Sequence, residues 1–191
     1  MARILLLDGH PDADRARFVH ALADAYATAA AEAGHDVRRV ELATLDVPLL
    51  RRAADWEEGT PPPAIADAQR AIAWAEHLVI LYPLWLGDMP ALLKGFLEQT
   101  LRPGFAIARG ARTLNPGLLR GRTARVVVTM GMPGFVYRWY FRAHGLKLLE
   151  RNILKFCGIG PVRSSVVGNV MSERNRMRAL RRMASLGARA G

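Results

Sequence analysis

The first residues able to bind a ligand follow a short apolar run over residues 3–8. His10 stands in a Gly-His-Pro turn, and Arg15 and Arg17 come where the pattern becomes helical. Free N–H groups at a helix N-terminus attract anions, and a guanidinium binds phosphate through its planar fork. The loop over residues 9–14 and the helix start after it therefore predict a phosphate site.

A second candidate site follows the unbroken apolar run over residues 78–81. The turn Pro83 to Leu86 carries Trp85, and Pro90 comes where the first turn of a helix tolerates proline. A third glycine-bearing loop, residues 130–134, follows another apolar run. Loops at the carboxyl ends of parallel strands are where open α/β sheets bind ligands. Their backbone amides and flat or flexible apolar groups suit an aromatic ring system. Together with the phosphate site, this suggests a flavin.

Several other chemistries lack their motifs. The chain has no G-x-G-x-x-G, no Walker loop, no G-x-S-x-G elbow and no H-E-x-x-H. We therefore predict neither a Rossmann nucleotide site nor a hydrolase, and no metal site. The single cysteine, Cys157, lies in an apolar segment, excludes an internal disulfide and agrees with a reducing compartment.

The elements that must position these loops alternate between strands and helices. We expect one domain over residues 1–191, with a three-layer α/β fold in which five strands alternate with five helices. The expected strands cover residues 3–8, 36–42, 78–82, 124–129 and 162–167. The expected helices cover residues 15–33, 64–75, 90–101, 135–156 and the terminal segment after Ser172, whose inward residues would be Met177, Leu180, Met183 and Ala184. The stretches 44–63 and 102–122 are irregular.

The motifs together resemble a known family, the flavodoxin-like NAD(P)H:quinone oxidoreductases. This group is similar to the mammalian quinone reductases, the bacterial modulator-of-drug-activity proteins and the flavoprotein partners of glutathione-gated potassium efflux systems. The resemblance covers residues 4–168. Its motifs are Gly9-His10-Pro11 with Phe18, Tyr82 to Trp85, Met89 to Phe96, Pro103 to Ala106, Leu118 to Arg122 and Phe156 to Ile159.

The resemblance implies a flavodoxin-like fold with a five-stranded parallel sheet in the order 2-1-3-4-5. It also implies a homodimer with two flavin sites at its interface. The implied activity is hydride transfer from NADPH or NADH, through bound FMN or FAD, to a quinone or similar two-electron acceptor.

The same resemblance assigns residues to this site. His10, Arg17 and Phe18 would lie at the flavin phosphate and ribityl chain, although many relatives carry a hydroxyl residue where Arg17 stands. The main chain of residues 83–86 would hold the ring, and residues 129–132 would close its other edge. The assigned ring contacts are Pro83, Leu84, Trp85, Leu86, Thr129, Gly131 and Met132. Tyr137 and His144 would face the nicotinamide or quinone as the catalytic pair.

The charge of the chain leaves two alternatives open. The formal net charge is +10, and the segment after Ser172 contains six arginines and one glutamate. One alternative is a nucleic-acid-binding module that uses this tail. Nucleic-acid surfaces usually carry interleaved aromatic residues, and this segment has none. We therefore expect a solvated helix face and no nucleic-acid partner. The other alternative is a regulatory flavoprotein associated peripherally with a membrane ion-efflux system. With neither a signal-peptide layout nor an apolar run of about 18 residues, we expect a cytoplasmic protein.

Overall fold

Five parallel strands form a single sheet in the computed structural model, which describes residues 1–110 and 117–191. The strand order is β2-β1-β3-β4-β5, which confirms the expected fold class and topology. The bounds agree with expectation to within about two residues: β1 covers Arg3–Asp8, β2 Asp36–Glu41, β3 His77–Pro83, β4 Thr123–Thr129 and β5 Val162–Val167.

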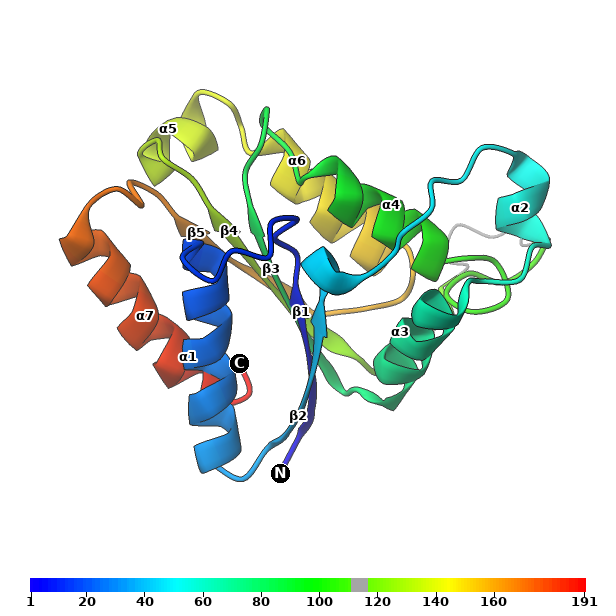
Figure 1. Ribbon diagram of the computed structural model, residues 1–191, viewed down its shortest axis with the longest axis horizontal. Helices are drawn as coiled ribbons and strands as arrows, with labels where there is room; N and C mark the ends of the chain where they lie inside the picture. The colour runs from blue at the N-terminus through cyan, green and yellow to red at the C-terminus, as the bar shows by residue number, and fades with distance from the viewer. Residues whose placement is uncertain (111–116) are drawn as a thin grey trace.

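Helices cover both faces of the sheet. Figure 1 shows α1 (Phe18–Glu32) and α7 (Glu173–Gly187) side by side on one face. The other face carries α3 (Pro63–Trp74), α4 (Ala91–Thr100) and α6 (His144–Lys147). The carboxyl ends of β1, β3 and β4 therefore meet at one edge, between the two helical layers.

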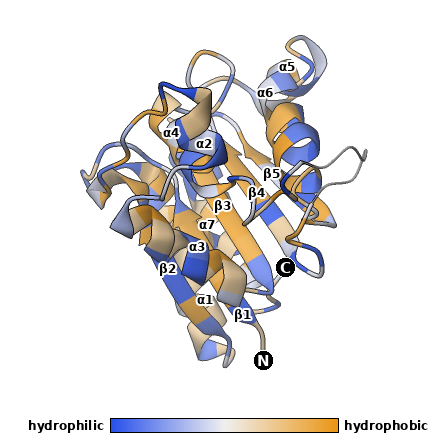
Figure 2. Ribbon diagram, turned by 90° about the vertical axis from the view of Figure 1, so that its right-hand side faces the viewer, coloured by the Kyte–Doolittle hydropathy of each residue, from blue (hydrophilic) through white to orange (hydrophobic). Residues whose placement is uncertain are grey.

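Apolar side chains on the two faces of β3 belong to two separate cores. Val79 and Leu81 pack with α1 and α7, whereas Leu78, Ile80 and Tyr82 pack with the opposite layer. Because successive side chains of a strand point to opposite faces, a strand covered on both sides must be apolar throughout. Figure 2 shows β3 and β4 mostly orange, whereas the helices around them alternate between blue and orange.

The long segment between β4 and β5 departs from the single helix expected over residues 135–156. It contains α5 (Gly134–Trp139), α6 and a π-helix, η2 (Leu148–Lys155). Arg142 and Ala143 have φ values of 52° and 49° and break the helix. Beyond the break, Gly145 lies so close to the turn after β3 that a Cβ there would come within 2.6 Å of Gly87 O. The break thus lets α6 approach that turn.

Three other expectations need adjustment. Helix α1 begins at Phe18 rather than Arg15, because residues 9–17 form a longer loop. The stretch 44–63 is not wholly irregular, since it contains the short helix α2 (Ala53–Glu57) and follows the 3-10 turn η1 (Leu42–Thr44). In α7, Met183 is buried as expected, but Met177 is 48% exposed, and Ala179 and Leu186 complete the inward face instead.

One buried arginine ties the two long loops to α4. Arg102 donates from Nη1 to Asp55 O at 2.9 Å and to Gly59 O at 2.8 Å, while its Nε donates to Gln99 O at 2.8 Å. Residues 111–116 of the second loop lie outside the described residues. Among the described residues, no helix combines the length and hydropathy needed to cross a bilayer.

The buried imidazole of His77 predicts a specific pH dependence of stability. Burial, together with Arg125 and Arg163 nearby, lowers the pKa of His77 from 6.5 to about 4. Its Nδ1 lies 2.6 Å from Thr123 Oγ1. Between these two pKa values the unfolded chain binds the proton and the folded chain does not, so stability falls as the pH drops through this window.

We expect His77→Gln to remove this contribution, which amounts to about 3 kcal/mol between pH 6.5 and pH 4. Urea denaturation of wild type and variant at several pH values measures it. His144→Gln, at an exposed position, serves as the control, and its free energy of unfolding should change with pH as that of the wild type does. Parallel curves for wild type and His77→Gln would contradict the assignment.

Candidate functional site

Three loops converge at the carboxyl edge of the sheet. The β1–α1 loop meets the β3–α4 loop through His10 and Trp85, whose rings pack edge to face with centroids 6.2 Å apart. The β3–α4 loop meets the end of β4 where Leu84 N donates to Thr129 O at 2.8 Å. The loops predicted separately from the sequence therefore form one continuous site.

The first loop begins with a close backbone approach. Gly9 N donates to Leu81 O at 2.7 Å, and a Cβ on Gly9 would come within 2.7 Å of that same oxygen. Only glycine fits here without a shift of the backbone. His10 follows, and its Nδ1 accepts a hydrogen bond from Asp12 N at 3.1 Å. Burial and the neighbouring His20 hold the pKa of His10 below its usual value, so its ring is neutral at pH 7.

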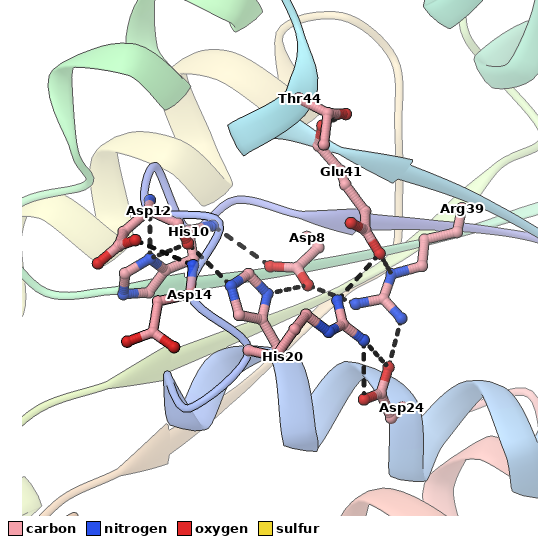
Figure 3. Close-up of polar contacts among 10 residues, drawn as sticks. Asp8, His10, Asp12, Asp14, His20, Asp24, Arg39, Glu41 and Thr44 are labelled. Carbon is pink, nitrogen blue, oxygen red and sulfur yellow. Dashed lines mark hydrogen bonds and ion pairs between the residues drawn. The ribbon is translucent and has the colours of Figure 1, made fainter.

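Beneath this loop lies a carboxylate that has no exposed surface. Asp8 Oδ2 is 2.7 Å from His20 Nδ1 and accepts from Arg39 Nη2 at 2.6 Å. Asp8 Oδ1 accepts from His10 N at 3.4 Å. Figure 3 shows Asp8 between the side chains of His20 and Arg39, which come from α1 and β2. The end of β1 is thus fixed to the two elements on either side of it.

His20 connects this carboxylate to the loop above. Its Nε2 lies 2.9 Å from Asp12 O, so both ring nitrogens face acceptors. Arg39 extends the network outward through ion pairs with Asp24 and Glu41.

The two loop arginines are already paired with carboxylates of the chain. Arg15 Nη2 donates to both oxygens of Asp24 at 3.0 Å, and its Nη1 donates to Glu41. Arg17 Nε donates to Asp12 at 2.7 Å. A hydrogen bond from Asp14 N, reinforced by Arg17, lowers the pKa of Asp12. A phosphate at this loop would therefore compete with carboxylates for the guanidinium groups.

Phe18 is the first residue of α1, directly after the first loop. Its ring packs in the core between α1, α7 and the sheet, and the Arg176 guanidinium lies 4.5 Å from its centroid. The expected contact of Phe18 with the phosphate and ribityl chain stays a prediction.

The second loop offers unoccupied backbone donors. Residues 85–88 form a tight turn in which Trp85 and Asp88 exchange backbone hydrogen bonds, with Leu86 and Gly87 at φ values of 48° and 85°. Among the described residues, the N–H groups of Leu86 and Gly87 have no partner. Trp85 is 49% exposed beside them, and Leu86 is fully exposed. Pro83 ends β3 directly before this turn.

The third loop leaves open space beside Thr129, which is buried. A Cβ on the exposed Gly131 would meet no atom within 4 Å, and in the described chain its N–H has no partner. Met132 is partly buried, and its carbonyl accepts from Asn169 N at 3.0 Å. A flat group with acceptor atoms can lie against these two loops.

The two residues expected to be catalytic occupy very different positions. Tyr137 is only 1% exposed, and its hydroxyl accepts from Leu146 N at 3.2 Å. That contact fixes α6 relative to α5 and leaves the phenol without access to a substrate. His144 is exposed at the start of α6.

Asp8, His20 and Arg39 were not predicted as part of the site. A carboxylate at the end of β1 and a histidine among the apolar positions of α1 were the available signals. Neither signal pairs these residues, because the network requires β1, β2 and α1 to meet in space.

A family model described as a flavodoxin-like fold matches residues 2–186. The chain belongs to this family. The match covers all five strands, and its description agrees with the observed topology.

Similar proteins include several oxidoreductases. An uncharacterized NAD(P)H oxidoreductase of Haemophilus influenzae is 26% identical over 87% of this chain and 83% of its own length. An FMN-dependent NADH:quinone oxidoreductase of Ruegeria pomeroyi is 33% identical over 36% of this chain and 34% of its own length. The NAD(P)H:quinone oxidoreductase structure from Methanothermobacter marburgensis superposes with a TM-score of 0.77 at 24% identity, covering 99% of this chain and 96% of the other.

The buried Asp8 network predicts a large loss of stability when its centre is removed. We expect Asp8→Ala to lower the free energy of unfolding by about 3–5 kcal/mol, because it leaves the Arg39 guanidinium and the buried His20 ring without the carboxylate that both contact. Denaturation in urea measures the loss. Asp36→Asn, an exposed carboxylate at the start of β2, should change stability by only about 0.5 kcal/mol. A similar small change for Asp8→Ala would contradict the role of the network.

Proposed function

We propose that the protein is a flavin-dependent NAD(P)H:quinone oxidoreductase that uses FMN. The observation that carries the proposal is the meeting of the turn 85–88 with the loop after β4. Unoccupied N–H groups of Leu86, Gly87 and Gly131 lie there beside a half-exposed tryptophan. The carbonyl oxygens and ring nitrogens of an isoalloxazine are acceptors that such groups can bind. The choice of FMN is supported by the Ruegeria relative's name.

The chain's residues take distinct roles in this proposal. Leu84, Trp85 and Leu86 bind one edge of the ring through the main chain, with Pro83 ending the strand beneath. Thr129, Gly131 and Met132 line its other edge. Arg15 and Arg17 bind the phosphate. The carboxylates that now pair with these two guanidinium groups must share them with the phosphate or release them. Neutral His10 lies between the ring and phosphate positions and is held by Asp12 N.

The bound flavin supplies hydride acceptance and donation, and the protein supplies position and exclusion of water. Trp85 shields the ring on the side of His10. His144 is the proton donor for the acceptor oxygen, since its ring is exposed and Tyr137 is buried.

We further propose a cytoplasmic homodimer. Large apolar side chains remain exposed next to the site: Phe135 is 69%, Trp139 86% and Tyr140 80% exposed. An exposed aromatic patch of this kind usually marks an interface. A second copy seated there would close the open side of the flavin site.

Purified protein titrated with FMN tests the proposal. We expect a visible flavin spectrum, bleaching on addition of NADH or NADPH, and recovery of the spectrum on addition of a quinone. Absence of flavin binding, with neither FMN nor FAD restoring it, would overturn the function. Bleaching without turnover with a quinone, together with co-purification of a transporter subunit, would favour a regulatory role.

Trp85→Ala should weaken FMN binding roughly 2- to 10-fold, as expected for the loss of one aromatic contact. Quenching of flavin fluorescence measures the dissociation constant. Trp74→Ala is the control, because Trp74 lies on α3 under the Arg38 guanidinium. Equal effects of the two substitutions would argue against the proposed place of the ring.

A further inference from the structure

A second group of basic residues lies in the amino-terminal half of the sheet, away from the convergent loops. Arg125, near the start of β4, is only 5% exposed and faces the layer of α1 and α7. Its Nη1 donates to Ser165 Oγ at 3.1 Å, and its Nε is buried without a partner among the described residues. Burial of a charge in this way is costly unless an opposite charge offsets it.

Three more arginines surround this buried group. Arg163 is the direct neighbour of Arg125 across the β4–β5 pair. Arg182 and Arg189 belong to α7 and the residues after it. Burial is the main cause that lowers the pKa of Arg125 below its usual value, and repulsion from these three arginines lowers it further. The other three arginines, Arg163, Arg182 and Arg189, are exposed, so the group borders on solvent.

These arginines lack a counter-charge. Every ion pair among the described residues joins other side chains, and none involves Arg125, Arg163, Arg182 or Arg189. The remaining residues, 111–116, contain no Asp or Glu. Like charges on neighbouring strands destabilise a sheet, so the arrangement calls for an external anion.

Neutral donors complete the surroundings of Arg125. The Tyr26 hydroxyl is buried without a partner in the described chain, and burial raises the pKa of Tyr26 to about 12, so the phenol keeps its proton. His77 Nε2 is also buried and unpartnered among the described residues. The cluster thus offers guanidinium and hydroxyl donors and no carboxylate.

We propose that Arg125, Arg163, Arg182 and Arg189 form an anion-binding site for a compact multivalent phosphate group. Guanidinium forks match phosphate oxygens, and a site with several cations favours a dianion or pyrophosphate over chloride. A compact ligand fits better than a nucleic acid, because the central guanidinium is buried. This site is distinct from the flavin site and does not depend on it.

Isothermal titration of the purified protein with sodium pyrophosphate, at ionic strength matched with sodium chloride, tests the proposal. We expect saturable binding at one site and a rise in melting temperature of about 3–6 °C at a concentration roughly ten times the Kd. Titrations with glycerol phosphate and with a single-stranded oligonucleotide, at equal phosphate concentration, show which class of phosphate compound the site binds. The phosphomonoester should bind more weakly than pyrophosphate, and the oligonucleotide should not compete with it.

Two variants locate the site. Arg125→Met keeps an unbranched apolar side chain and removes the buried charge, so the protein should remain folded and lose at least about tenfold in pyrophosphate affinity. Arg163→Gln, at an exposed position, should weaken binding severalfold and keeps the test valid if Arg125→Met fails to fold. Arg181→Gln, on the exposed face of α7, is the matched control and should bind as wild type does.

Three results would overturn the site. One is a wild-type melting temperature that responds to pyrophosphate no more than to sodium chloride. Another is an equal loss of pyrophosphate affinity in Arg163→Gln and Arg181→Gln, which would indicate diffuse attraction of the anion to a basic surface. The third is tighter binding of the oligonucleotide than of pyrophosphate, which would assign the surface to nucleic acid.

Discussion

The carboxylate of Asp8 is buried at the end of β1 and binds side chains from two other elements. His20 reaches it from α1 and Arg39 from β2. Because an unpaired charge in this position would be strongly destabilising, the three elements must keep their relative positions. The loop over residues 9–17 depends on this arrangement, since His20 also contacts Asp12 O within that loop. The first wall of the candidate site is therefore fixed by electrostatics as well as by apolar packing.

The arginines at the carboxyl edge of the sheet and the group around Arg125 differ in their ion-pair partners. At the carboxyl edge, Arg15, Arg17 and Arg39 each contact carboxylates of the chain. In the amino-terminal half, Arg125 and its neighbours have no such partners within the described residues. Part of the excess positive charge therefore lies where no side-chain carboxylate of the described residues forms an ion pair with it. This difference gives the two regions different ligand chemistry, although both belong to the same sheet.

Periodicity and turn chemistry predicted much of the fold. The apolar run over residues 78–81 identified the central strand, and the turn around Trp85 gave the position of the main ligand loop. Contacts between distant segments were beyond such reasoning. The break at Arg142 and Ala143 depends on α6 approaching the turn at Gly87, and local propensity carries no sign of it. Likewise, Tyr137 has the sequence context of a surface helix, yet its hydroxyl is buried against Leu146 N. The isolated Arg125 of β4 matters only because Arg163 lies beside it in the sheet.

In the proposed function, three loops form one flavin-binding edge. A crystal structure of the protein grown with FMN tests this most directly. We expect electron density for the flavin ring against the main chain of residues 84–87 on one side and Gly131 on the other, with the phosphate near Arg15 and Arg17. Ring density elsewhere, such as in the hollow between α4 and η2 that Phe156 lines, would contradict it.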